Sequence, residues 1–353
     1  MTQPEEQASR TSARGRFSRR ALLVASAVGG LAVGGAVGVP RLREVAGDKA
    51  VVSAPGPDLL AGAMVGAPLD ERDVDRWRSD IDTLAKYGQT LLRTGIYAWK
   101  VAPEKDRWDS AAASFYTEQF EYARNAGLAI NLVLPGAPDW AQAYGFDEYV
   151  AACTWIWGQM RQTFGAQVAL WQPFNEADEA HYQHFTPATR DAAYLSEFSQ
   201  LLGLAKKTLG TNGAPVTTNL TGWPLNDERE DEWYTVLDAI AEQLDVISID
   251  LYPADQEHEI ALLAERVQRV KQRYGKSVFV AELGLQTAAG SWTEPEQQRY
   301  VPAAIDQLRT TELWGICLYE LRDTEVQPGF GIKRADGTHK EGFDDVMRSL
   351  GSR

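Results

Sequence analysis

The sequence contains few cysteines and few histidines, and this scarcity excludes several kinds of site. Its 353 residues include two cysteines, Cys153 and Cys317, each within an apolar run. They support neither a disulfide framework nor cysteine metal-site spacing, so we expect two buried free thiols. The four histidines all lie in predicted loops or helices away from the strand ends: His181, His184, His258 and His339. This placement disfavours zinc chemistry and a Ser-His-Asp hydrolase, and we expect neither a metal nor a cofactor.

Positive charge is scarce as well. There are 35 Lys and Arg against 49 Asp and Glu, a net charge of −14. Residues 1–50 hold eight basic and four acidic groups, so the remaining residues have 27 basic against 45 acidic groups and carry −18. An acidic surface repels a phosphate backbone, and we therefore expect no nucleic-acid partner. The hydrophobic content of 44% is that of a globular protein with a sizeable core.

The N-terminal residues differ in composition from the rest of the chain. Arg19 and Arg20 precede an uncharged stretch rich in glycine and alanine at residues 21–39. Residues 1–40 therefore resemble a twin-arginine export signal, which directs a folded protein across a bacterial membrane. The alternative is a membrane tether through residues 21–39, because a stretch of this length can span a bilayer. We expect an exported protein, extracellular or associated with the cell envelope, with residues 41–57 as a polar linker.

Strand-like and helix-like segments alternate regularly over residues 58–353. The predicted strands are residues 60–64, 90–96, 129–134, 168–174, 215–219, 246–251, 277–281 and 315–321. The helix predicted after each of them covers residues 70–87, 110–126, 146–164, 188–209, 231–243, 257–274, 293–310 and 343–350. Eight such units predict an α/β protein with a single (β/α)₈ TIM barrel. A doubly wound sheet is the alternative, but VGAPLDERD after the first strand is no glycine-rich phosphate turn.

Two glutamates follow strongly apolar predicted strands. Glu176 comes after the fourth strand in VALWQPFNEAD, and Glu282 ends the seventh in VFVAELG. The carboxyl ends of barrel strands meet at one face, where the chemistry of such barrels takes place. Two facing glutamates can hydrolyse a glycoside, because one protonates the leaving oxygen while the other attacks the anomeric carbon.

Several segments resemble the clan A glycoside hydrolases, most of all family thirty-nine and the cellulase-like family five. The segments are LWQPFNEAD, VLPGAPDWA, ISIDLYPAD, FVAELGLQT and the closing YELRDTEVQPGFGIKRADGTHKEGFDDV. The resemblance extends over residues 59–350 and implies a retaining glycosidase of TIM-barrel fold.

The resemblance also assigns roles to individual residues. Glu176 would be the general acid/base and Glu282 the nucleophile. Asn175 would hydrogen-bond the sugar 2-hydroxyl, a contact that strengthens in the transition state. Tyr252 would donate to Glu282, and Arg93 would supply positive charge beside the same carboxylate.

Substrate contacts are expected from aromatic residues in the loops. Tyr319 stands where the clan often has a tryptophan that forms the floor of the −1 subsite. Indole faces stack on pyranose rings, so four tryptophans are candidate sugar platforms, although each could instead pack a loop against the barrel. They are Trp99, Trp140, Trp223 and Trp292.

The sequence departs from the clan pattern at two further positions. Ala177 stands where proline usually follows the Asn-Glu pair, and Asp250 stands where histidine often precedes the tyrosine by two residues. Asp250 could alter the charge balance or contact substrate hydroxyls. We therefore expect an exported retaining β-glycosidase that acts on an oligo- or polysaccharide. The alternative is a catalytically silent barrel that binds cell-envelope polysaccharide, whereas the shortage of metal ligands disfavours a metal-dependent lyase.

Overall fold

The computed structural model describes one folded body, and the N-terminal segment is not among the described residues. The described residues are 59–134, 136, 139–141, 144–177, 192–210, 213–220, 227–252, 256–287, 292–325 and 328–351. The expected export signal or anchor at residues 1–40 and the linker at residues 41–57 lie outside them. Within this part of the chain, no helix is both long enough and apolar enough to cross a membrane.

Seven parallel strands form one curled sheet in the described residues. Their order in the sheet is β4-β3-β2-β1-β7-β6-β5. The strands are β1 (Leu60–Met64), β2 (Leu91–Gly95), β3 (Ala129–Val133), β4 (Val168–Gln172), β5 (Ile247–Leu251), β6 (Val278–Leu283) and β7 (Gly315–Leu318). Residues of β4, β5, β6 and β7 are buried along their whole length. This is why these segments read as continuous apolar runs, since a parallel sheet is covered on both faces.

The fifth predicted strand, residues 215–219, is a bridging segment between β4 and β5. Isolated parallel bridges join Val216 to Trp171 and Asn219 to Asn175. On the other side, the Asp245 amide donates to the Val216 carbonyl at 2.8 Å. The segment is irregular because its side chains replace part of the ladder: the Thr217 hydroxyl donates to the Val246 carbonyl at 2.8 Å. The sheet is therefore TIM-barrel-like, with seven assigned strands where the sequence predicted eight.

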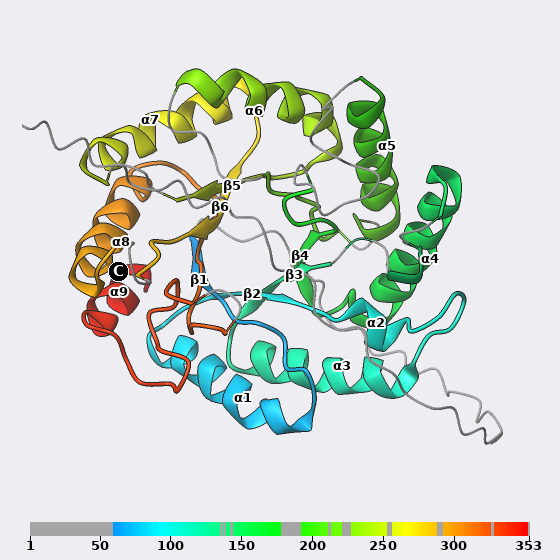
Figure 1. Cartoon of the computed structure of the whole chain (residues 1–353), viewed down its shortest axis with the longest axis horizontal. Coiled ribbons are helices and arrows are strands. Elements are labelled where there is room, and N and C mark those ends of the chain that lie inside the picture. Colours follow the sequence, from blue (N-terminus) through cyan, green and yellow to red (C-terminus); the bar gives the residue numbers. More distant parts are fainter. Residues whose placement is uncertain are drawn as a thin grey trace, which may run out of the picture. The chain divides into compact units, whose positions relative to one another are not determined.

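Helices surround the sheet (Figure 1). They are α1 (Glu71–Lys86), α2 (Ala98–Val101), α3 (Ser110–Asn125), α4 (Phe146–Phe164), α5 (Ala192–Leu209), α6 (Asp227–Ile240), α7 (Gln256–Tyr274), α8 (Glu294–Leu308) and α9 (Phe343–Leu350), with short 3-10 turns at Asp139–Ala141 and Ala241–Gln243. The capping box expected at Thr293 and Glu296 is present at the start of α8. The short helix α2 was not predicted, and α6 begins four residues before the predicted helix.

An apolar cluster fills the inside of the sheet below the strand ends. Its members are Leu91, Leu170, Val246, Phe279, Ala281, Trp314 and Cys317. Alternate residues of a strand point to the same face, so Leu91 and Leu170 share a face with Arg93 and Gln172. The inside of the sheet therefore passes from an apolar base to a polar layer near the carboxyl ends. Both cysteines are buried and free, as predicted.

Candidate active site

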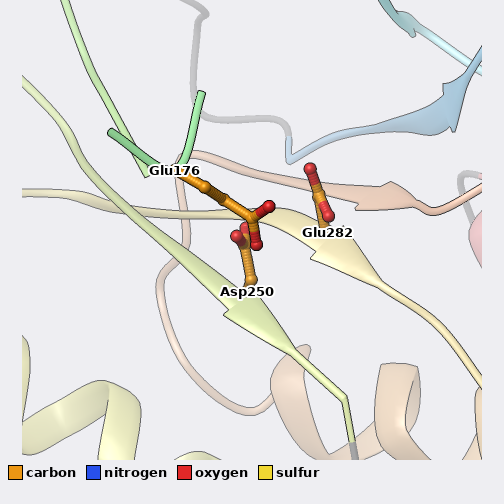
Figure 2. Close-up of side chains that lie close together, drawn as sticks. All are labelled: Glu176, Asp250 and Glu282. Carbon is orange, nitrogen blue, oxygen red and sulfur yellow. The ribbon is translucent and has the colours of Figure 1, made fainter. Parts of the chain in front are cut away.

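Three carboxylates meet at the carboxyl ends of the strands. Glu282 lies on β6, Asp250 on β5, and Glu176 follows β4. Figure 2 shows the Glu176 side chain extending toward Asp250, with Glu282 beside them. One oxygen from each of the three groups lies within 4.8 Å of the others. The structure therefore brings together the two glutamates that were predicted from the sequence. Asp250, on β5, adds a third carboxylate to them.

A β-bulge in β6 sets the register of two of these carboxylates. Ile249 pairs with Val280, but the next residue, Asp250, pairs with Glu282. The extra residue in β6 is Ala281. A bulge redirects the side chains that follow it, and here it places Asp250 and Glu282 opposite each other.

Arg93 on β2 connects the nucleophile candidate to the rest of the site. Its Nη1 donates to Glu282 Oε1 at 2.9 Å, and its Nη2 to Asn175 Oδ1 at 2.6 Å. Its Nε donates to Gln172 Oε1 at 3.2 Å. Burial, the largest single influence, lowers the pKa of this guanidinium, but the acidic groups around it, Glu282 first among them, together outweigh burial and raise the pKa above its usual range. Arg93 thus remains a fixed positive charge that is 1% exposed.

A chain of amide groups extends from Arg93 to Asp250. Gln172 Nε2 donates to Asn219 Oδ1 at 2.7 Å, and Asn219 Nδ2 donates to Asp250 Oδ2 at 2.7 Å. The backbone amide of Glu176 also donates to Asn219 Oδ1, at 3.3 Å. Sequence reasoning assigned no role to Gln172, although an amide at the end of the apolar strand 168–172 was a signal. The amides therefore hold the Asp250 carboxylate and the Glu176 backbone in place.

Tyr252 donates its hydroxyl hydrogen to Glu282 Oε2, as the family resemblance implies. Its ring packs edge-on against Tyr319 at 6.2 Å between centroids and against Phe330 at 5.5 Å. Gly284 permits this packing, because a Cβ there would lie 2.5 Å from the Tyr319 carbonyl oxygen. Tyr319 is therefore held beside the carboxylates by Tyr252 and Phe330.

Asp250 is fully buried and forms no ion pair with a basic residue in the described part of the chain. Its Oδ1 has no hydrogen-bond partner within the described part of the chain. Burial raises the pKa of Asp250 well above its ordinary value, and Glu282 and Glu176 raise it further. A cation could approach these three carboxylates, but Arg93 and Tyr252 already donate to both oxygens of Glu282. The Glu282 carboxylate is therefore better suited to be an anion held by protein donors than to be a metal ligand.

The candidate sugar platforms differ in their surroundings. Trp99 is 48% exposed, and its ring centroid lies 6.0 Å from that of Tyr97. Trp140 donates from Nε1 to the Ala102 carbonyl at 2.9 Å and packs edge-on against two aromatic rings, those of Tyr144 and Trp155. Trp292 is partly buried against the main core. Trp223 lies outside the described residues. Trp99 is thus the most open of the three candidate platforms within the described residues.

Comparisons with known proteins agree with this arrangement. Residues 148–314 match the family model described as "Glycosyl hydrolase catalytic core". The matched region contains both Glu176 and Glu282. No curated protein sequence matches the chain. The family match is consistent with the resemblance to clan A and supports a glycosidase.

Solved structures share the fold at low sequence identity. A GH5_18 protein from Streptomyces cattleya in complex with GlcNAc is 15% identical, with a TM-score of 0.69, 84% of this chain covered and 80% of that one. A β-glycosidase from Pyrococcus horikoshii is 12% identical, with a TM-score of 0.66 and coverage of 86% and 97%. A β-glucosidase from Thermotoga maritima in complex with deoxynojirimycin is 15% identical, with a TM-score of 0.63 and coverage of 85% and 99%. These likenesses establish the TIM-barrel-like fold.

Proposed function

We propose that this glycosidase hydrolyses β-linked oligo- or polysaccharides with retention of configuration, with Glu176 as acid/base and Glu282 as nucleophile. The observation that carries the proposal is the different environment of the two groups. Glu282 accepts hydrogen bonds from a buried guanidinium and from the Tyr252 hydroxyl. Both donors stabilise the ionised carboxylate, which is the form that can attack an anomeric carbon.

The reaction has two steps. In the first, Glu176 transfers its proton to the leaving oxygen while a Glu282 oxygen forms a bond to the anomeric carbon. In the second, ionised Glu176 takes a proton from a water molecule, whose oxygen attacks the anomeric carbon and displaces Glu282. The sugar then carries a hydroxyl on the face that the leaving group occupied, and both carboxyl groups return to their initial states.

The distance between the glutamates supports retention over inversion. Retaining glycosidases hold the two carboxyl groups about 5–5.5 Å apart, whereas inverting enzymes separate them by about 6.5–9.5 Å to admit a water molecule. An oxygen of Glu176 lies within 4.8 Å of an oxygen of Glu282. This spacing is closer to that of the retaining enzymes.

Asn175 is oriented for the role that the resemblance gives it. Its Oδ1 accepts from Arg93 at 2.6 Å and from Gln172 at 3.1 Å. The amide is planar, so its Nδ2 lies on the other side of the group and can donate to a sugar 2-hydroxyl. Because proteins of similar fold are named as β-glucosidases and mannosidases, β-glucosides and β-mannosides are the first substrates to test.

We further propose that residues 1–40 direct export by the twin-arginine route, with residues 21–39 as the possible tether and the carbohydrate substrate outside the cell. The supporting feature is the Arg19–Arg20 pair before an uncharged stretch. Replacement of both arginines by lysine should leave the protein inside the producing cell, as measured by fractionation. Unchanged export of that variant would rule out this route.

The catalytic assignment is tested with a panel of aryl β-glycosides and with plant and bacterial glycans. We expect Glu282→Gln to lose turnover, and Glu176→Gln to lose about 10²–10⁴-fold on substrates with poor leaving groups. Glu118→Gln on the exposed surface of α3 is the matched control and should retain wild-type activity. Retained activity of Glu282→Gln would contradict the mechanism. Glycan binding without any turnover by wild type would instead support the silent polysaccharide-binding barrel.

A further inference from the structure

Asp250 stands apart from the two glutamates because the reaction requires only two carboxyl groups. It lies on β5 opposite Glu282 and is fully buried. The Asn219 amide fixes its Oδ2 at 2.7 Å. Figure 2 shows the Glu176 carboxyl group extending to it across the strand ends. A buried carboxyl group with an oxygen within 4.8 Å of an oxygen of the acid/base candidate therefore needs an explanation of its own.

We propose that Asp250 is a positioning residue that shares one proton with Glu176, so that the pair retains this proton to a higher pH than an isolated glutamate would. The proposal rests on the function proposed above, since it concerns the acid/base of that reaction. It explains what a carboxylate does at a position where the resembling enzymes often have histidine.

The charges around Asp250 favour a bound proton. The titratable and charged groups that face it are Glu176 after β4, Glu282 on β6, Arg93 on β2, Cys317 on β7 and Tyr252 at the end of β5. Three carboxylates therefore surround a single guanidinium. Two carboxyl groups with oxygens within 4.8 Å of each other cannot both ionise easily in a buried site, so one of them retains a proton. Burial and the neighbouring carboxylates raise the pKa of Asp250 accordingly.

Glu176 is the partner for this proton, and Glu282 is not. Both Glu282 oxygens accept from protein donors, namely Arg93 and Tyr252, which favour its ionised form. Asp250 Oδ2 accepts from Asn219, while its Oδ1 has no hydrogen-bond partner among the described residues. The open oxygen and the direction of the Glu176 side chain place the proton between these two groups.

Sharing affects both steps of the proposed reaction. At the start, the pair of Glu176 and Asp250 holds one proton, which Glu176 transfers to the leaving oxygen. The pair is then fully ionised, and repulsion between its charges makes Glu176 a stronger base toward the incoming water. The water proton restores the original state, so no further reactant is needed. Titration of such a pair belongs to both groups together.

The first experiment measures kcat/KM against pH for wild type and Asp250→Asn. The asparagine oxygen still accepts from Asn219, so the variant keeps the contact and removes the titrating group. We expect the basic limb of the profile to move at least about one pH unit lower, with activity retained on the acidic side. Asp147→Asn on the exposed start of α4 is the control and should reproduce the wild-type profile. A basic limb at the same pH in Asp250→Asn would overturn the proposal.

A second experiment does not depend on activity. The folded state binds the proton more tightly than the unfolded state, because the folded pKa of Asp250 is raised; stability is full at low pH and falls as the pH rises through the folded pKa. Wild type, Asp250→Asn, Glu176→Gln and the double variant are unfolded in urea between pH 4 and pH 9.

A shared proton predicts that the effects of the two single substitutions on this pH dependence do not add up in the double variant. Additive effects would overturn the proposal even in an active enzyme. Absence of glycoside turnover, by contrast, would refute the proposed function while the urea cycle still decides whether the proton is shared.

Discussion

Substitution of Arg93 by methionine should destabilise the fold strongly, although the new side chain is apolar and of similar length. Arg93 is 1% exposed and Glu282 is 4% exposed. Removal of one partner of such a buried pair leaves an uncompensated charge, at a cost of about 3–5 kcal/mol. Gln172 and Asn175 each lose a donor as well, at roughly 1 kcal/mol per hydrogen bond. Because whole domains are stable by only about 5–15 kcal/mol, this loss threatens folding at room temperature.

Two further variants separate charge from geometry. Arg93→Lys keeps the positive charge but cannot donate to Glu282, Asn175 and Gln172 at once, so we expect a smaller loss of about 1–3 kcal/mol. The double variant Arg93→Met with Glu282→Gln removes both charges and should be more stable than Arg93→Met alone. Each protein is unfolded in urea at pH 7 and followed by tryptophan fluorescence. Midpoints are compared between proteins whose free energy of unfolding has the same slope against urea concentration.

The control is Arg76→Met, which breaks an ion pair with Asp73 on the surface of α1. Arg76 is 59% exposed there, so the expected change is under about 1 kcal/mol. The reasoning is refuted if Arg93→Met lies within 1 kcal/mol of wild type, on the scale of exposed pairs. It is refuted equally if the double variant is no more stable than Arg93→Met, because the charge of Glu282 would then contribute nothing.

Two other substitutions test the surroundings of the site. Burial, then Asp323 and Glu282, raise the pKa of Glu320 from 4.5 to about 8, so its stabilising contribution is full below the unfolded pKa and is lost as the pH rises to 8. Glu320→Gln should therefore be more stable than wild type at pH 9, by at most about 5 kcal/mol. The urea midpoints of both proteins are measured from pH 5 to pH 9. If the midpoints of the variant and of wild type changed equally with pH, this prediction would be wrong. Gly284→Ala should destabilise by about 1–3 kcal/mol and lower turnover, because its Cβ meets the Tyr319 carbonyl; Gly66→Ala, with nothing within 4 Å, is the control, and equal midpoints for the two variants would contradict the clash.

Much of the site could be predicted from strand positions. Parallel strands end at the same face, so residues that follow apolar runs must meet there. For this reason Glu176, Asn175, Tyr252 and Glu282 could be placed together from sequence alone, and the structure does bring them together. Arg93 was predicted beside Glu282, and the structure places its Nη1 2.9 Å from Glu282 Oε1.

Register and irregularity could not be predicted in the same way. The bulge at Ala281 leaves no mark in the apolar run that precedes Glu282, because the neighbouring strand determines it. The segment 215–219 was predicted as a regular strand, but hydroxyl groups at Thr217 and Thr218 bond to backbone carbonyls beside it. Such side-chain contacts depend on tertiary neighbours that a local pattern does not contain.

The exposure of aromatic residues could not be predicted from the sequence either. Trp140 and Trp99 were both predicted in loop segments after strands, and each could be a sugar platform or pack against the barrel. In the structure, Trp140 is partly buried between Tyr144 and Trp155, whereas Trp99 is exposed. Indole is large and amphipathic, so it serves either purpose equally well, and only the neighbours decide between them.

The site is asymmetric in its hydrogen-bond donors and acceptors, and because of this asymmetry the residue at position 250 affects the acid/base candidate. Donors converge on Glu282, while a carboxyl group and the Asn219 amide oxygen lie on the side of Glu176. A histidine at position 250 could carry a positive charge and would favour ionised Glu176; an aspartate has the opposite effect. The Asn219 amide contacts both Asp250 and the Glu176 backbone, so a change at position 250 alters the charge and the orientation of the acid/base together. Asp250→His should therefore lower the basic limb further than Asp250→Asn does, because charge as well as hydrogen bonding is reversed.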